Sequence, residues 1–291
     1  MFDIVIGSGM GFITASSLGY CHSTQIQPLE LYSKLSKEVF CRTAIQKLVA
    51  HGKLSSLYDE NALHDLLLQY FGQDLSLSSA SPKLVGVTKR NHDDGAFLIR
   101  SYEAKDAMLS PGDSRWSVVE AIRACIANSM YLPPYENGSD VYRSAPAIFS
   151  NPTKLLIEEV QELLGTRRLS DYVDVVVTLG PGLTQYHVLG DVKMVEGDIL
   201  DQVMTPSFMD ESKEVEFVHH QMEQLQEQEK KDGGRSFEYF YFNPTLTILH
   251  KIAADTFTLE NFRKIAEATS GTAEFESLCR KLMGPLPIYP V

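Results

Sequence analysis

The stretch that decides the fold is Phe2-Asp3-Ile4-Val5-Ile6-Gly7-Ser8-Gly9-Met10-Gly11. Its first half is an apolar run typical of a buried parallel strand, and the glycines that follow end the strand in a sharp turn. Residues 12–20 are small and apolar, which predicts a helix directly after the turn. A strand, a glycine-rich turn and a helix form one of two sites: a phosphate cradle, or a nucleophile elbow in which a strained turn exposes a serine.

The phosphate cradle is the poorer match. The dinucleotide fingerprint G-x-G-x-x-G would need a glycine at residue 12, which is Phe12. It would also need an acidic residue at the end of a second strand about 20 residues later, and none stands there. The elbow pattern G-x-S-x-G fits better, because Gly7 and Gly11 occupy its two outer positions. Gly9, however, stands where the serine should be, and glycine offers no nucleophile.

Ser8 is the one hydroxyl inside this turn, so it is the candidate substitute nucleophile. A frame shifted by one residue would put Ser8 at the tip of the elbow. That frame loses both outer glycines, which allow close packing of strand and helix. We therefore interpret Ser8 as a small turn residue that bonds to a local backbone amide.

Strands and helices alternate along the rest of the chain, and several strands are largely apolar. This pattern predicts an α/β architecture with a mostly parallel sheet. We expect a single domain over residues 1–291, with a core over 1–183 and a C-terminal strand and helices over 184–291. Residues 190–210 and 231–235 carry the weakest structural signals. Strands are expected at residues 83–88, 96–102, 175–179 and 237–242, and helices at residues 60–71, 116–128, 153–164, 211–230, 259–268 and 272–283.

The composition excludes some partners. The formal net charge is −12, which disfavours nucleic acid and simple electrostatic docking on anionic lipid, because both need a basic surface. No apolar run approaches the ~18 residues that span a bilayer, and no basic stretch with an apolar segment follows Met1 to suggest a secretory signal. The four cysteines form no CxxC pair. We expect a reduced cytoplasmic protein that associates with membranes only peripherally.

Several segments together resemble the patatin-like phospholipase family. Residues 2–11 with Ala15 are similar to its elbow strand and helix, and the further matches follow in the family's order. The branch that the chain resembles most is the calcium-independent phospholipases. The matching segments are Glu30–Phe40, Leu57–Gly72, Trp116–Ala124 with Tyr131, Ser150-Asn151-Pro152 and Val175–Gly180.

The resemblance implies a three-layer α/β/α fold with a serine–aspartate dyad. In that family the serine attacks a glycerolipid ester, the aspartate is the general base, and a glycine-rich loop stabilises the oxyanion. Here the serine position is Gly9. The family's Asp-Gly-Gly, counted back from Asn151, falls on Ser144, Ala145 and Pro146. Because the chain begins at Met1, the family's N-terminal strand and oxyanion loop are expected to be missing.

Three other groups of polar residues are candidates for a functional site. Asp140 lies four residues before Ser144 and is the candidate substitute base, although an exposed loop carboxylate is the preferred interpretation. Asp93-Asp94-Gly95 is interpreted as a hairpin turn, because Asp-Gly is a strong turn signal. His219 and Glu223 stand four residues apart, beside His220, on a charged helix. Without an HExxH frame or an apparent third ligand, we interpret them as a solvated face, and we expect neither a metal nor another cofactor.

Three hypotheses of function follow. The first is a catalytically inactive patatin-like protein that binds a lipid or fatty acyl ligand, or regulates lipid metabolism by pairing with an active relative. The second is an active acyl hydrolase that uses Ser8 with a base such as Asp140. The third is a truncated product with an exposed strand edge. The sequence favours the first, because both dyad positions hold residues that cannot do this chemistry.

Overall fold

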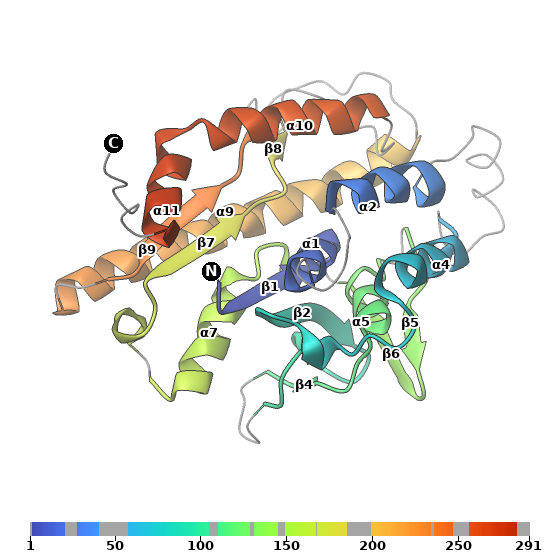
Figure 1. Ribbon diagram of the computed structural model, residues 1–291, viewed down its shortest axis with the longest axis horizontal. Helices are drawn as coiled ribbons and strands as arrows, with labels where there is room; N and C mark the ends of the chain where they lie inside the picture. Colours follow the sequence, from blue (N-terminus) through green and yellow to red (C-terminus); the bar gives the residue numbers. More distant parts are fainter. Residues whose placement is uncertain are drawn as a thin grey trace, which may run out of the picture.

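The computed structural model describes residues 2–20, 28–40, 58–104, 110–128, 131–144, 149–166, 168–184, 199–233, 236–246 and 256–283. The predicted elbow is present as strand β1 (Ile4–Ser8) followed by helix α1 (Met10–Gly19). Figure 1 shows this unit near the middle of the molecule. Helix α2 (Pro28–Lys34) continues into a π-helical turn, η1 (Leu35–Val39).

The largest sheet contains six strands. Its order is β4-β3-β2-β6-β5, and β1 pairs with β2 off this path. The strands are β2 (Lys83–Arg90), β3 (Phe97–Arg100), β4 (Gly112–Asp113), β5 (Tyr135–Asn137) and β6 (Asp140–Arg143).

This sheet is mixed, so the expectation of a mostly parallel central sheet is wrong. Strand β2 pairs with β1 in parallel but with β3 and β6 antiparallel, and β5 and β6 are also antiparallel. The physical reason is the connections: tight turns join β2 to β3 and β5 to β6, and short turns can link only antiparallel neighbours. The turn at Asp93-Asp94-Gly95 is one of them, which confirms its interpretation as a hairpin.

Helices cover both faces of this sheet. On one face a large apolar cluster joins α1 and α2 with Leu84 and Ile99 of the sheet. The same cluster includes helix α4 (Glu60–Phe71), whose first turn is capped by Asp59, and helix α5 (Val118–Cys125). On the other face, Val85 and Val87 pack against residues that include Leu155. Leu155 belongs to helix α7 (Thr153–Leu164).

A second layered region is built on β7 (Val175–Leu179), which pairs in parallel with β9 (Glu238–Phe242). One face of this pair contacts α7 and the long helix α9 (Ile199–Gly233) through Val218 and Met222. The other face contacts helix α11 (Ala273–Met283) through Leu278. In Figure 1, α9 runs alongside β7 and β9 across much of the molecule, and helix α10 (Thr256–Ser270) lies above them.

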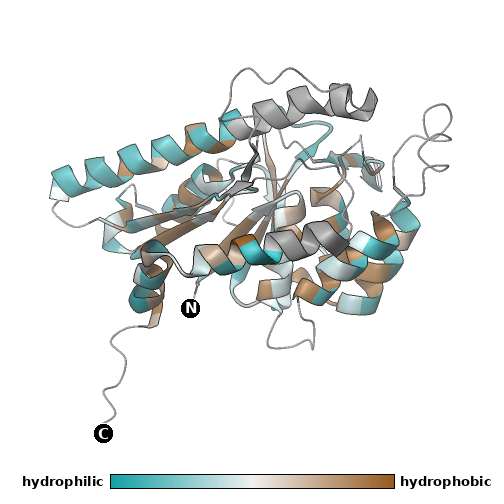
Figure 2. Cartoon of the chain, turned by 90° about the horizontal axis from the view of Figure 1, so that it is seen from above, coloured by the Kyte–Doolittle hydropathy of each residue, from teal (hydrophilic) through white to brown (hydrophobic). Residues whose placement is uncertain are grey.

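The remaining elements are short. They are the 3-10 turns η2 (Leu77–Ser79) and η3 (Leu169–Asp171), and the parallel pair β8 (Leu183–Thr184) and β10 (Thr245–Leu246). Figure 2 shows apolar residues concentrated on the strands and on the inward sides of the helices, with α9 hydrophilic along much of its described length. Within the described ranges, no helix is both long enough and apolar enough to cross a membrane.

Candidate functional site

The turn between β1 and α1 has the backbone geometry of an elbow. Gly9 lies between the strand and the helix with φ 53° and ψ −131°, a conformation that L side chains rarely adopt. The helix starts at the next residue, and the N–H of Phe12 donates to the carbonyl of Gly9 at 3.0 Å. A residue at this position therefore stands at the tip of a tight bend, where any side chain would strain the backbone.

The two outer glycines differ in what they do. A Cβ on Gly7 would lie 2.6 Å from both the Cα and the N of Phe12, so only glycine fits where the helix folds back on the strand. A Cβ on Gly11 would meet nothing within 4 Å. The steric reason proposed from the sequence for both glycines thus holds for Gly7 and not for Gly11.

Ser144 lies opposite this bend. It directly follows β6, and its N–H donates to the carbonyl of Ala127 at 2.9 Å, just beyond the end of α5. A Cβ built on Gly9 would lie 3.8 Å from the Ser144 Oγ. Two residues far apart in the sequence are thereby brought face to face, and they are the two that the family resemblance assigned to the dyad. Ala145 and Pro146 lie outside the described residues.

The pair lacks the groups that acyl transfer needs. Gly9 has no side chain, and the hydroxyl of Ser144 is a neutral donor and acceptor that is not a useful general base. Over the described part of the chain, the Ser144 hydroxyl makes no hydrogen bond to a carboxylate or an imidazole. A serine without a neighbouring base is a weak nucleophile. The arrangement holds a polar, uncharged contact where the resemblance implies a reactive pair.

Ser8 is the last residue of β1 and pairs with Val87 of β2. Successive side chains of a strand point to opposite faces of the sheet. Ile6 and Ile4, two and four residues before Ser8, pack on the face that carries Val85 and Val87. Ser8 shares that side, whereas the missing side chain of Gly9 would point toward Ser144. Ser8 and a side chain at residue 9 would therefore point toward different parts of the protein.

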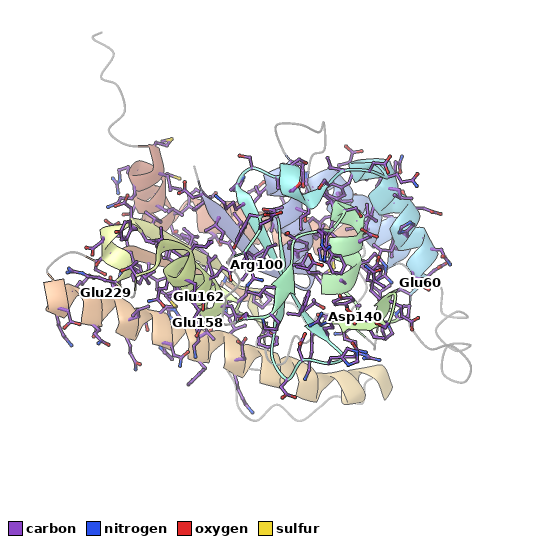
Figure 3. The ribbon with its side chains drawn as sticks, turned by 90° about the horizontal axis from the view of Figure 1, so that it is seen from below. Glu60, Arg100, Asp140, Glu158, Glu162 and Glu229 are labelled. Atoms are coloured by element: carbon purple, nitrogen blue, oxygen red, sulfur yellow. The ribbon has the colours of Figure 1, made fainter. Side chains whose placement is uncertain are left out.

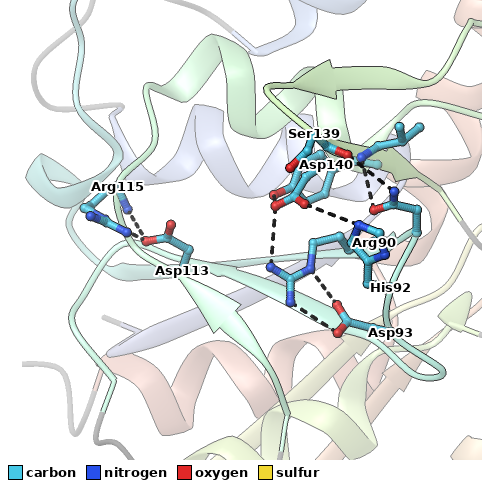
Figure 4. A network of polar contacts seen from close by, with 10 residues as sticks. Arg90, His92, Asp93, Asp113, Arg115, Ser139 and Asp140 are labelled. Atoms are coloured by element: carbon cyan, nitrogen blue, oxygen red, sulfur yellow. Dashed lines mark hydrogen bonds and ion pairs between the residues drawn. The ribbon is translucent and has the colours of Figure 1, made fainter.

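Asp140 lies at the other end of β6, beside the hairpin turn, and about 13 Å of extended chain separates it from Ser144. Its carboxylate lies 3.6 Å from Arg90 Nη1 and 3.8 Å from His92 Nε2, and Figure 4 shows this group. Arg90 also binds Asp93, with Nε 2.9 Å from its carboxylate. These contacts join two neighbouring hairpins. The structure does not bring Asp140 to the elbow.

A buried ion pair that the sequence analysis missed lies elsewhere in the core. Arg100 of β3 donates from Nε and Nη2 to the two carboxylate oxygens of Glu159 in α7, at 2.6 and 2.8 Å, and both residues are almost fully buried. Tyr102 donates to the same carboxylate at 2.6 Å. Burial and this hydrogen bond raise the pKa of Tyr102. Figure 3 shows Arg100 in the interior, well separated from Asp140.

An open pocket of about 580 Å³ lies between α4 and the start of α5. Its lining includes His64, Gln73, Trp116 and Glu120 but neither Gly9 nor Ser144. Glu120 completes a capping box with Ser117, which satisfies the exposed N–H groups of α5. Because neither Gly9 nor Ser144 lines the pocket, it is separate from the candidate site at the elbow.

His219, His220 and Glu223 of α9 form a group of possible metal-binding side chains, which we call the helix α9 cluster. His219 Nε2 lies 3.6 Å from one Glu223 carboxylate oxygen, and His220 Nδ1 lies 3.0 Å from the other. The donor atoms of all three side chains lie within 4.8 Å of one another. The sequence analysis interpreted these three residues as a solvated helix face, whereas the structure brings their donor atoms together.

Comparison with known proteins gives a consistent set of relatives. No protein-family model matches the chain. The sequence is 26% identical over 255 residues to calcium-independent phospholipase A2-gamma of Mus musculus, an alignment that covers 84% of this chain and 31% of that protein. It is 28% identical over 191 residues to the Homo sapiens protein of the same name, covering 62% of this chain and 24% of that protein. The chain thus spans about a third of these relatives or less.

Proposed function

We propose that this chain, a distant homologue of calcium-independent phospholipase A2-gamma, is a catalytically inactive protein of the patatin-like phospholipase family that binds an acyl lipid. The homology confirms the resemblance to that branch of the family. The inactivity and the ligand are proposals, and each rests on observations that can be tested separately.

One observation carries the proposal. The elbow keeps its sharp bend at Gly9, and the position assigned to the family's aspartate lies opposite it, yet the two residues are glycine and serine. Loss of a nucleophile typically lowers turnover by roughly a million-fold, and loss of the second member of the same unit adds little further. The pair therefore supports an inert site on a framework shared with hydrolases.

The choice of an acyl lipid as ligand rests on the relatives and on charge. These relatives are named as phospholipases, enzymes that act on phospholipids. The net charge of −12 here opposes recruitment by an anionic surface. A neutral or zwitterionic acyl lipid, recognised through its apolar chain, is the class of ligand that fits both facts. Anionic vesicles are the contrasting ligand in the binding experiment below.

The proposed lack of catalytic activity is tested with a fluorophosphonate probe and a p-nitrophenyl ester. We expect the purified protein to show neither labelling nor hydrolysis above a heat-denatured control. Ser8→Ala and Ser144→Ala are the informative variants, because Ser8 adjoins Gly9 in the chain and the Ser144 Oγ lies 3.8 Å from a Cβ built on Gly9. Labelling that disappears in either variant would identify a working nucleophile and overturn the inactive assignment. Labelling that persists in both would place an active serine elsewhere and overturn it equally.

The proposed binding of an acyl lipid is tested with a fluorescent fatty acyl chain and with zwitterionic and anionic vesicles. We expect saturable binding of the acyl probe, displaced by lysophosphatidylcholine, and weaker binding to anionic vesicles. Ser144→Phe fills the space in front of Gly9 and should weaken acyl binding about tenfold or more, roughly 1.4 kcal/mol. Ser139→Phe is the matched control, since Ser139 lies in the exposed turn of the same β5–β6 hairpin. Equal effects of the two substitutions would reject the elbow as the acyl site.

A further inference from the structure

Three side chains that can bind a metal converge on one stretch of α9. His219 and Glu223 are one helical turn apart and face the same side, and His220 turns toward the same carboxylate. His219 Nε2 and His220 Nδ1 lie 3.6 and 3.0 Å from the two oxygens of Glu223. Two imidazole nitrogens and a carboxylate are a common ligand set for zinc in proteins.

The spacing of these atoms is close to what a zinc ion needs. Zinc binds imidazole nitrogen and carboxylate oxygen at about 2.0–2.2 Å in tetrahedral geometry, which separates neighbouring ligand atoms by roughly 3.4 Å. Each imidazole lies near that separation from a different oxygen of Glu223, at 3.6 and 3.0 Å, and one donor atom from each of the three side chains falls within 4.8 Å of the others. Small side-chain rotations would complete the geometry without moving the backbone of the helix.

The surroundings of His219 orient its ring for this role. The ring stacks on Tyr241 of β9 with centroids 3.9 Å apart and an angle of 14° between the planes. Its Nδ1 lies 3.3 Å from the hydroxyl of Tyr239, which leaves Nε2 directed toward Glu223. A histidine ligand is usually held in this way, with its second nitrogen bonded to a neighbouring group that fixes the tautomer and the ring orientation.

The local charge also favours a cation. Tyr241 donates to Glu216 at 2.6 Å, so a second carboxylate lies within the same group of side chains on α9 and β9. The side chain of His219 is 16% exposed, while those of Glu223 and His220 are 52% and 66% exposed. The site is thus anchored on its inner side and open to solvent on the other, which gives an ion a path of entry.

We propose that His219, His220 and Glu223 form a binding site for one zinc ion on the surface of α9, with Tyr239 as the residue that positions His219. The fourth position of the tetrahedron would be taken by water. This site does not depend on the proposed lipid-binding function, because it shares no residue with the elbow.

The experiment uses the full chain without a histidine tag, freed of metal by chelation and dialysis. Zinc is titrated by calorimetry, its stoichiometry is measured by equilibrium dialysis, and cobalt serves as a visible probe of tetrahedral nitrogen and oxygen ligands. We expect one ion per chain, with affinity falling at acidic pH because protons compete for the imidazole nitrogens. The combined His219→Ala and His220→Ala variant should lose the cobalt absorption and weaken zinc binding by about 100-fold or more.

Two further variants separate ligands from supporting groups. Glu223→Gln keeps the shape of the side chain and removes its charge, so it should weaken zinc binding about tenfold or more. Tyr239→Phe removes only the hydroxyl beside His219 and should cost about tenfold, in the range found for groups that orient a metal ligand. His92→Ala is the control, because His92 is an exposed histidine that also lies near a carboxylate but outside this cluster.

Three results would overturn the site. The first is no zinc binding at micromolar concentrations to the unmodified chain. The second is equal zinc affinity in the double histidine variant and in the His92→Ala control, which would place the ion on other residues. The third is one ion for every two chains, which would indicate a bridged dimer rather than a site within one chain. Circular dichroism of each variant checks that the helix remains folded.

Discussion

The elbow and the helix α9 cluster are opposite cases of how a site is built. At the elbow the backbone geometry is held by contacts such as that between Gly7 and Phe12, while the two facing positions, Gly9 and Ser144, carry no reactive group. On α9 the donor groups of His219, His220 and Glu223 converge, although nothing in the local sequence follows a known metal-binding motif. One region keeps the scaffold without the chemistry, and the other has the chemistry without a recognised scaffold.

The difference shows that fold and chemistry are specified by different residues. An elbow is maintained by steric requirements on glycines and on the first turn of the helix, and these persist as long as the protein must fold. Catalysis depends on a few side-chain atoms whose loss costs the fold nothing. Substitutions that affect only one of these two requirements can therefore separate them.

The largest expected effect is on the scaffold. Gly7→Ala would place a methyl group 2.6 Å from backbone atoms of Phe12, which cannot move without displacing α1. We expect a loss of about 3 kcal/mol in the free energy of unfolding, as for other overpacked sites, measured by urea denaturation. Gly11→Ala is the control: its Cβ meets nothing within 4 Å, and alanine favours a helix, so stability should stay within about 1 kcal/mol. Similar losses in both variants would refute the steric assignment of Gly7.

The next effect concerns chemistry at the same bend. Gly9→Ser combined with Ser144→Asp would place a hydroxyl beside a carboxylate, because the Cβ of residue 9 lies 3.8 Å from the Ser144 Oγ. We expect weak hydrolysis of a p-nitrophenyl ester, about 100-fold above Gly9→Ser alone, which is the usual contribution of a positioned general base. The control is Gly9→Ala with Ser144→Asp, which carries the same backbone strain but no nucleophile. Equal rates in the double variant and this control would show that the two positions do not cooperate.

Local signals in the sequence predicted the elements that the elbow needs. The helix that directly follows the glycine turn, helix α4 over residues 60–71, and the Asp-Gly hairpin between β2 and β3 all appear where the sequence predicts them. Each depends on contacts within a few residues, so the chain itself carries the information. The mixed sheet was not predicted. The Asp-Gly turn indicates one antiparallel pair, but the alternation of strands and helices along the chain favours a parallel sheet.

Features that depend on contacts between residues far apart in the sequence could not be predicted from local sequence patterns. The approach of Gly9 to Ser144 was expected only through the family resemblance, since no local pattern links the end of β1 to the end of β6. Neither partner of the buried Arg100–Glu159 pair carries a signal for the other, because they lie on β3 and α7. The start of α9 at Ile199 was also missed, since residues 190–210 showed weak periodicity.

The smallest expected effect tests whether the two regions are coupled. Glu214 lies on α9 before the histidine cluster, and its carboxylate accepts a hydrogen bond of 2.8 Å from the N–H of Asn151, just before α7. Burial raises the pKa of Glu214 to about 7, against which the backbone hydrogen bonds of Asn151 and Ser150 act only partly. Between its unfolded value and about 7, the folded protein therefore binds more protons than the unfolded chain.

Because the folded protein binds more protons than the unfolded chain in this pH range, its stability decreases as the pH rises. The contribution of Glu214 to stability is complete at pH values below its unfolded pKa and is lost as the pH rises through about 7. Glu214→Gln removes the charge but keeps an acceptor for Asn151, so it should match the parent near pH 5 and exceed its stability by about 1–2 kcal/mol near pH 8, allowing for solvent screening. Urea denaturation across this range measures the difference, with Glu227→Gln, an exposed carboxylate of the same helix, as the control. A parallel pH dependence in parent and Glu214→Gln would show that ionisation of Glu214 does not weaken the attachment of α9 to the segment before α7, where Asn151 also donates to the carbonyl of Val215.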